Sequence, residues 1–265
     1  MAKKICLDAG HYGKINVCPA IPEYYESERM WDLHLLLKKK LEAYGFEVIT
    51  TRADQTVDKA LTQRGKMAAG CDLFISMHSN ATYNYQMDET VDYVVAIVAL
   101  DGSADEIGGK LAQVVAETMG VTEGSHIFKR YYDEENKNLD YYGVIRGAVS
   151  VGVPAMLLEH SFHTNTRMVR WLLDDQNLDK LAQAEADLIA EYFGINIPAE
   201  YDPWTAKVVN TEALNVRRTP NAEIIKEIYS ITVIGEEPDS DGDIWYKVRL
   251  GDGTIGYLWP EYLER

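Results

Sequence analysis

The sequence has few cysteines, few basic residues and no long apolar run, and each of these shortages excludes a class of protein. Only three cysteines occur among 265 residues, Cys6, Cys18 and Cys71. This odd, low count argues against a scaffold held by disulfides, so we interpret all three as structural. Lysine and arginine total 26 against 42 acidic residues, which gives a formal net charge of -16. Because an acidic surface repels phosphate backbones, we expect no nucleic-acid partner.

The chain also lacks the segments that direct proteins into or across membranes. No run of about eighteen apolar residues is present, so we expect no membrane span and no membrane partner. The first residues, MAKKICLDAGH, hold too few apolar positions before an acidic one to form a signal-peptide core. We therefore expect synthesis in the cytoplasm without an export signal. Hydrophobic residues still make up 46% of the chain, an ordinary globular composition.

Most of the chain alternates between the strand and the helix periods of hydrophobicity. Strands are predicted over residues 3–9, 46–51, 72–77, 91–100 and 155–158. Helices are predicted over residues 26–44, 62–69, 105–119 and 178–193. Residues 121–142 are rich in Tyr, Asp and Asn and have no period, so we predict a loop there. Strands that alternate with helices predict an α/β fold with a mostly parallel twisted sheet flanked by helices.

The hydrophobic pattern of the sequence changes after residue 195. Residues 198–203 contain two prolines and no hydrophobic period, which predicts a linker. Beyond it, short strand-like pieces are separated by turn signals such as Gly251-Asp252-Gly253. Such pieces, repeated over about sixty residues, are typical of a small all-β barrel. We therefore predict two domains, residues 1–197 and residues 204–265, joined by the linker 198–203.

Polar residues of the metal-ligand type follow three of the predicted strands. His11 follows the first strand, His78 the third and Glu159 the fifth, and a further carboxylate, Glu26, begins the first helix. In α/β sheets, ligands bind outside the carboxyl ends of the strands. Two histidines and a carboxylate form a catalytic zinc set that leaves a position for water. A separate carboxylate, here Glu159, could act as the general base.

Each of these residues also has a purely structural interpretation. A histidine at a strand end is more often a satisfied polar residue than a ligand, and Glu26 or Glu28 could simply complement the helix dipole. From spacing alone, therefore, a metal site and a set of ordinary polar residues both remain open. We interpret His34 as a surface or core residue of its helix. We place the remaining histidines in loops and do not expect them to be ligands: His126, His160 and His163.

Four segments in the right order resemble the zinc-dependent N-acetylmuramoyl-L-alanine amidases of the type-3 family. The resemblance covers roughly residues 3–195, and the distance from the family's ligand glutamate to a helix-ending glycine, here Gly45, selects Glu26 over Glu28. One departure is Tyr12, which stands where the family has a glycine. The segments are Leu7–Gly13, Glu26–Arg52, Leu73–Ala81 and Leu157–Asn165.

The resemblance implies a function for the candidate residues. In the family pattern, His11, Glu26 and His78 would bind zinc, and Glu159 would be the catalytic base. The substrate would be the peptidoglycan amide between the lactyl group of N-acetylmuramic acid and the first L-alanine of the stem peptide. We also expect Asn80 and His126 as candidate substrate contacts, the latter because its long loop could reach the site.

The C-terminal part resembles bacterial SH3-type cell-wall-binding domains. The similar segments are Leu214–Pro220, Ile244–Val248, Gly256–Trp259 and Tyr262–Leu263, with a mild departure at Arg218-Thr219-Pro220. Aromatic residues of this part could bind the wall, or they could fill the core of a small barrel: Tyr229, Tyr246 and Trp259.

The function predicted from these observations is hydrolysis of peptidoglycan by an endolysin or autolysin. The missing signal peptide favours a phage endolysin, because such enzymes commonly leave the cell through a separate, holin-type membrane pore and then act on the wall. Two alternatives remain: a non-catalytic wall-binding protein, and a zinc peptidase that cuts within the stem peptide. We expect a monomer.

Overall fold

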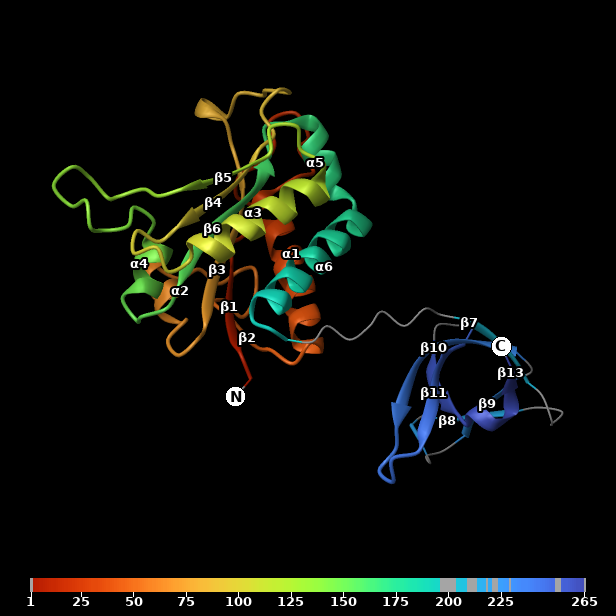
Figure 1. Ribbon diagram of the computed structural model, residues 1–265. Coiled ribbons are helices and arrows are strands. Elements are labelled where there is room, and N and C mark those ends of the chain that lie inside the picture. Colours follow the sequence, from red (N-terminus) through yellow and green to blue (C-terminus); the bar gives the residue numbers. More distant parts are fainter. Residues whose placement is uncertain are drawn as a thin grey trace. The chain divides into compact units, whose positions relative to one another are not determined.

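The computed structural model describes residues 2–195, 204–208, 214–217, 219–220, 224–228, 230–250 and 254–264. The chain divides into two compact units, Met1–Ile197 and Pro198–Arg265, which Figure 1 shows in different colours of the sequence scale. The first unit has a mixed α/β fold and the second is a small all-β sheet, so the predicted fold class is confirmed. The predicted linker 198–203 lies outside the described residues.

The first unit is built on one six-stranded sheet with the strand order β2-β1-β3-β6-β4-β5. Its strands are β1 (Lys4–Ala9), β2 (Glu47–Thr50), β3 (Leu73–Asn80), β4 (Val94–Val98), β5 (Ser125–Phe128) and β6 (Ala155–Phe162). Strands β2, β1, β3 and β6 run parallel to one another. Strand β4 is antiparallel to β6 and parallel to β5. The carboxyl ends of β1, β3 and β6 therefore meet at one edge of the sheet.

Helices cover the two faces of this sheet unequally. They are α1 (Glu26–Ala43), α2 (Leu61–Lys66), α3 (Asp105–Met119), α4 (Gly143–Val149), α5 (Thr166–Leu173) and α6 (Asp175–Tyr192), with a single 3-10 turn, η1 (Tyr83–Tyr85). Helices α1, α3 and α6 pack with the larger core on one face, whereas the short α2 and α4 lie at the opposite face (Figure 1). The face of the short helices is the one on which a cavity forms.

Helix α1 illustrates how the sequence specifies the larger core. Met30, Leu33, Leu37 and Leu41 recur at three- and four-residue steps, and all four are buried. Burial of each such side chain contributes about 2 kcal/mol relative to exposure. The helix is followed by Gly45, whose φ of +87° is a conformation that glycine adopts without strain. This packing fixes the position of the first residue of the helix, Glu26.

His34 is a core residue of α1. Its side chain is 1% exposed, its ring lies 4.4 Å from that of Trp31, and its Nδ1 contacts the Trp31 carbonyl oxygen. Burial lowers the pKa of His34 to about 4, because the charged form loses its hydration. Of the two interpretations left open for this histidine, the structure selects the core.

The buried His34 should make the protein less stable in mild acid. Its folded-state pKa is below its unfolded one, so as the pH falls below about 6.5 the unfolded chain binds a proton that the folded chain does not. When the pH is lowered from 7.5 to 5.5, the unfolding free energy of both the wild type and the His34→Gln variant is measured. We expect the decrease to be about 1 kcal/mol smaller in the variant than in the wild type. Urea unfolding at both pH values measures this difference, and identical losses in the two proteins would contradict it.

Helices α2 and α4 approach each other closely through glycines. A methyl group at Gly65 would overlap the Val144 carbonyl oxygen, and one at Gly147 would overlap the Thr62 carbonyl oxygen. Only residues without a Cβ allow this contact, which seats the start of α4 at Gly143 next to the cavity.

The Gly147→Ala variant should therefore be destabilised although alanine favours helices. We expect a loss of about 1–3 kcal/mol of unfolding free energy, because backbone atoms must move apart to admit the methyl group. Urea unfolding measures the loss. An unchanged or increased stability would show that the two helices are not packed as described.

The structure also corrects several sequence-based predictions. The loop predicted over 121–142 is wrong in part, because residues 125–128 form the edge strand β5, whose side chains are too exposed to give a strong apolar signal. Strand β6 continues to Phe162 rather than ending at residue 158, so the prediction of a loop at His160 is wrong. Helices α4 and α5 were not predicted; the first is short and contains two glycines, and the second spans only eight residues.

The second unit is an antiparallel sheet with the order β13-β7-β10-β11-β12-β8-β9 over its described residues. Its strands are β7 (Trp204–Val208), β8 (Leu214–Arg217), β9 (Ile224–Ile228), β10 (Ser230–Pro238), β11 (Ile244–Arg249), β12 (Ile255–Leu258) and β13 (Leu263–Glu264). Val216, Val233, Val248 and Leu258 are among its buried core.

The aromatic residues singled out in this unit differ in their surroundings. Tyr246 packs against the core and is partly buried. Trp259 is also partly exposed, with its ring 5.2 Å from that of the buried Trp245. Tyr229 lies outside the described residues. Partial exposure leaves both proposed uses, wall contact and barrel core, open to Tyr246 and Trp259.

Candidate active site

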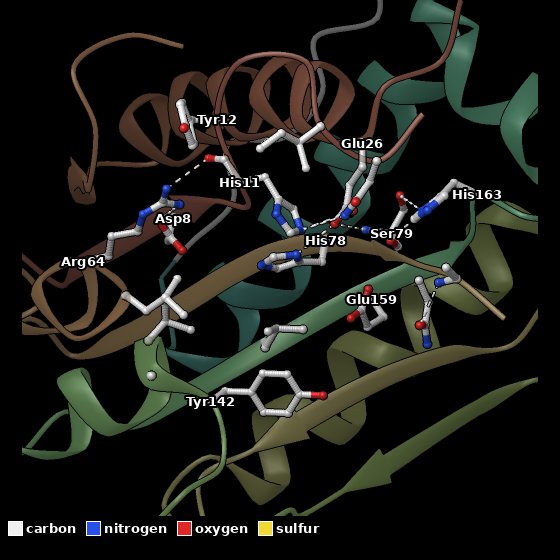
Figure 2. Close-up of a pocket in the computed structure, with 18 of the residues that line it drawn as sticks. Asp8, His11, Tyr12, Glu26, Arg64, His78, Ser79, Tyr142, Glu159 and His163 are labelled. Carbon is white, nitrogen blue, oxygen red and sulfur yellow. Dashed lines mark hydrogen bonds and ion pairs between the residues drawn. The ribbon is translucent and has the colours of Figure 1, made fainter. Parts of the chain in front are cut away.

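The ends of three neighbouring strands and the start of α1 surround one cavity of about 520 Å³ (Figure 2). His11 lies two residues beyond the end of β1, and His78 lies in β3 opposite its register partner Glu159 in β6. Glu26, the first residue of α1, is directed toward both histidines. The structure thus brings together all four residues that the sequence pattern singled out.

Glu26 and the two histidines form a compact set of donor atoms. One atom from each of His11, Glu26 and His78 lies within 4.8 Å of the others, and no second group of three such donors occurs among the described residues. Glu26 Oε2 lies 3.3 Å from His11 Nε2, and Glu26 Oε1 lies 2.8 Å from His78 Nδ1. A tetrahedral zinc ion with bonds of about 2.0 Å separates its ligand atoms by about 3.3 Å. The residues present therefore fit a zinc ion.

The electrostatics of this set favour a charged carboxylate. Burial alone would raise the pKa of Glu26, but the hydrogen bonds and charges of His11 and His78 outweigh it and hold that pKa well below its usual range. Burial would likewise lower the pKa of His11, and the hydrogen bond to Glu26 raises it instead. A buried carboxylate that stays ionised between two imidazoles is suited to bind a cation.

Asn16 holds the carboxylate from the loop that precedes α1. Its side-chain amide donates to Glu26 Oε2 at 2.5 Å and lies 3.1 Å from His11 Nε2. Its φ of +58° is a left-handed conformation that asparagine tolerates better than most residues. Sequence reasoning missed Asn16, because no local pattern distinguishes it within a loop.

His78 is oriented from its other side by Ser76. The Ser76 Oγ lies 3.1 Å from His78 Nε2 and donates to the buried Asp8 Oδ2 at 2.7 Å. The ring also lies so close to Gly10 that a methyl group at that position would overlap it. Partners of this kind fix the ring of a metal-binding histidine and raise its affinity for the ion.

A buried arginine, which the sequence did not reveal, fixes the loop that carries His11. Arg64 of α2 is 2% exposed and donates to the His11 carbonyl oxygen at 3.2 Å and to the Ala9 carbonyl oxygen at 3.3 Å. Its charge is balanced by Asp58 at 2.6 Å and by Asp8 at 3.5 Å. These long-range contacts tie α2 to the end of β1.

Glu159 differs from Glu26 in having no partner for one of its oxygens. Its Oε2 is buried and accepts no hydrogen bond from any described residue. Burial, and secondly the negative charge of Glu26, raise the pKa of Glu159 well above its usual value. A buried carboxyl oxygen without a partner costs folding free energy, so its position next to the cluster of His11, Glu26 and His78, which we call the metal-type cluster, indicates a chemical role.

The remaining histidines and Asn80 occupy distinct places. His160 points to the opposite face from Glu159, where its Nε2 lies 2.6 Å from Glu185 Oε1. His163 lines the cavity, and its Nε2 is buried without a partner among the described residues. Asn80 also lines the cavity, whereas His126 is exposed on β5 and does not. The roles of Asn80 and His126 as substrate contacts stay predictions.

A comparison with known protein families decides the identity of the first unit. The sequence profile of the N-acetylmuramoyl-L-alanine amidases matches residues 5–191. The chain belongs to this family. It is also 30% identical over 202 residues to the endolysin of Bacillus phage SPP1, a match that covers 74% of this chain and 68% of that endolysin. The enzyme is thus an amidase that hydrolyses an amide of peptidoglycan, as an endolysin or autolysin does, and this prediction is confirmed.

Solved structures show the same fold for this amidase. The catalytic domain of CwlV from Bacillus (Paenibacillus) polymyxa var. colistinus superimposes with a TM-score of 0.60 at 23% identity, covering 73% of this chain and 99% of that domain. The CwlD amidase of Clostridioides difficile, solved in complex with the GerS lipoprotein, gives 0.60 at 19% identity over 73% of this chain and 100% of CwlD.

Proposed function

We propose that this amidase is zinc-dependent and cuts the amide between the lactyl group of N-acetylmuramic acid and the first L-alanine of the stem peptide. His11, Glu26 and His78 would hold the zinc ion, and Glu159 would be the catalytic base. The observation that carries the proposal is the convergence of these three donors, within 4.8 Å of one another, on the strand pair that also carries Glu159.

The residues of the site divide the chemistry between them. When bound, zinc would lower the pKa of a water molecule to about 7 and stabilise negative charge on the substrate oxygen. Glu159 would take a proton from the attacking water and return it to the amine that leaves. The raised pKa of Glu159 suits this exchange, because the carboxyl group can hold the proton between the two steps.

The neighbours of the three metal-binding residues have a supporting role in this proposal. Asn16 donates to Glu26 Oε2, and Ser76 with Asp8 holds the His78 ring. Fixed ligands bind a metal more tightly than mobile ones because less order is lost on binding.

A soluble substrate tests the choice of bond. The purified full chain is incubated with an N-acetylmuramoyl peptide and, separately, with the same peptide without the sugar, and products are identified by mass spectrometry. We expect a free lactyl carboxylate and a peptide that begins with L-alanine, and no cleavage of the free peptide. Cleavage within the peptide would instead establish the peptidase alternative, and wall binding without any cleavage would establish the non-catalytic one.

We further propose that residues 204–265 form an SH3-like domain that binds the cell wall. Support comes from the resemblance of this segment, from its compact antiparallel sheet and from the partly exposed Trp259. Sedimentation with purified walls tests this. The full chain should pellet with the walls, and the chain that ends at residue 197 should remain largely in the supernatant while it still cleaves a soluble substrate. Equal pelleting would contradict the proposal.

The cellular route of the enzyme is also a proposal. The likeness to a phage endolysin supports action on the wall after release through a separate, holin-type pore. Among the described residues, no helix combines the length and the apolar character that a membrane crossing requires. The monomeric state stays a prediction.

A further inference from the structure

A second, smaller hollow adjoins the cavity that contains His11, His78 and Glu159, which we call the reaction cavity. Both lie on the same side of the sheet. The smaller hollow has a volume of about 250 Å³ and shares Asn80 and Tyr142 with the larger cavity. Figure 2 shows Tyr142 on the side of Glu159 that faces away from the metal-type cluster. The remaining lining residues are Val95, Ile97, Phe128, Lys129 and Arg130. We refer to this feature as the Arg130 hollow.

One face of the sheet forms the floor of both the reaction cavity and the Arg130 hollow, as the pairing of its strands shows. Leu157 of β6 pairs with Ile97 of β4, and Ile97 pairs with Phe128 of β5. In the same way, Glu159 pairs with Val95 one step along the strands. Residues that pair directly point to the same face of a sheet, so both rows lie on the face of the reaction cavity.

The spacing of the strands sets how much substrate fits between the two spaces. Neighbouring strands lie about 4.8 Å apart, so the β5 end of the floor is about 10 Å from β6, the strand that carries Glu159. The hollow begins at Val95 and Ile97 of β4, one strand spacing of about 4.8 Å from β6. Two extended peptide residues span at most about 7 Å, so a stem peptide whose first amide lies beside Glu159 places its second residue over the hollow.

The two cations of the hollow differ in availability. Lys129 Nζ pairs with Asp105 Oδ2 at 2.7 Å. Arg130 takes part in none of the ion pairs found among the described residues; its guanidinium group stacks on the Tyr141 ring at 3.7 Å from the ring centre. Arg130 also forms a hydrogen bond with the Tyr142 side chain, and it lines the hollow without a carboxylate partner among the described residues. A guanidinium group binds carboxylates through paired, charge-assisted hydrogen bonds.

We propose that the Arg130 hollow is a subsite for the stem peptide, in which Arg130 binds the free carboxylate of the second residue. This inference rests on the proposed function, since that places the first amide beside Glu159. The apolar floor of Val95, Ile97 and Phe128 packs against the peptide. The exposed guanidinium group of Arg130 selects for the negative charge of the second residue's carboxylate. A glycan strand would not need this cation, because its hydroxyl groups are neutral.

The kinetic test uses two substrates that differ in one group. N-acetylmuramoyl-L-alanyl-D-isoglutamyl-L-lysine carries the carboxylate, and the D-isoglutamine compound carries an amide in its place. We expect the wild type to prefer the carboxylate by about tenfold in kcat/KM, and Arg130→Gln to abolish this preference through a higher KM. The matched control is Arg170→Gln, which removes the same charge from an exposed position on α5 and should keep the preference.

A binding measurement separates this inference from the proposed function. The Glu159→Gln protein, with and without Arg130→Gln, is titrated calorimetrically with the two free tripeptides. The carboxylate tripeptide should bind about tenfold more weakly once Arg130 is replaced, and the amide tripeptide should bind equally to both proteins. Normal cleavage without any carboxylate preference in either assay would overturn the subsite. Absence of cleavage with the preference intact would overturn the proposed function and leave the subsite standing.

Discussion

The Glu159→Gln variant should lose about 10²–10⁴-fold in kcat and keep its fold and its metal. Glutamine occupies the same volume but cannot take up and return a proton. Its Oε2 atom is buried and has no hydrogen-bond partner in the described structure, so the replacement breaks no hydrogen bond of that oxygen. Turnover of a soluble muramoyl peptide measures the loss, and metal content and thermal unfolding measure what is retained.

The position of Glu159 allows the variant to distinguish a catalytic base from a metal ligand. His78, its register partner in β3, belongs to the proposed metal set, whereas Glu159 itself does not. A variant that lost the metal together with activity would show that Glu159 is a ligand and not the base. A variant that kept activity within about tenfold of the wild type would assign proton transfer to another group.

The Glu26→Gln variant should lose both the metal and the activity, whereas Glu28→Gln should keep both. Glu26 is 1% exposed and lies between the two imidazoles, so its carboxylate would coordinate the metal directly in the proposed site. Glu28 lies two residues further along the helix and is partly exposed. Its ion pair among the described residues is with Lys14, at 3.9 Å. We expect a drop of more than about a hundredfold in zinc affinity for Glu26→Gln.

This pair of variants is closely matched, because both remove one negative charge from the first turn of α1. Both therefore weaken the favourable interaction with the helix dipole by a similar amount. Metal content after dialysis against dilute zinc, together with turnover, measures the outcome. Equal zinc retention in the two variants would contradict the assignment of Glu26, and loss of zinc in Glu28→Gln alone would transfer that assignment to Glu28.

The residues whose convergence was predicted from the sequence share a local signal. Strands β1, β3 and β6 are apolar, buried and followed or ended by a polar residue, so the pattern marks His11, His78 and Glu159 without any knowledge of tertiary contacts. Because parallel strands align their carboxyl ends, the same reasoning also predicts that these side chains meet. The structure agrees on that convergence.

The residues that were missed act through contacts across long sequence separations. Arg64 reaches the His11 carbonyl oxygen over 53 positions, and His163 contacts the Ser79 carbonyl oxygen over 84. No local pattern encodes such a contact. The error at His160 has a different cause. The predicted strand was ended before the polar Glu159, whereas β6 continues through this residue to Phe162.

Digestion of purified peptidoglycan by the zinc-depleted and the zinc-reloaded enzyme is the sharpest test of zinc-dependent cleavage at the proposed bond. Mass spectrometry then identifies the new chain ends. We expect intact glycan strands and stem peptides with a free L-alanine amino group, absent without zinc and restored by about one equivalent of it. Equal digestion by the metal-free protein, or new ends at any other bond, would contradict this expectation.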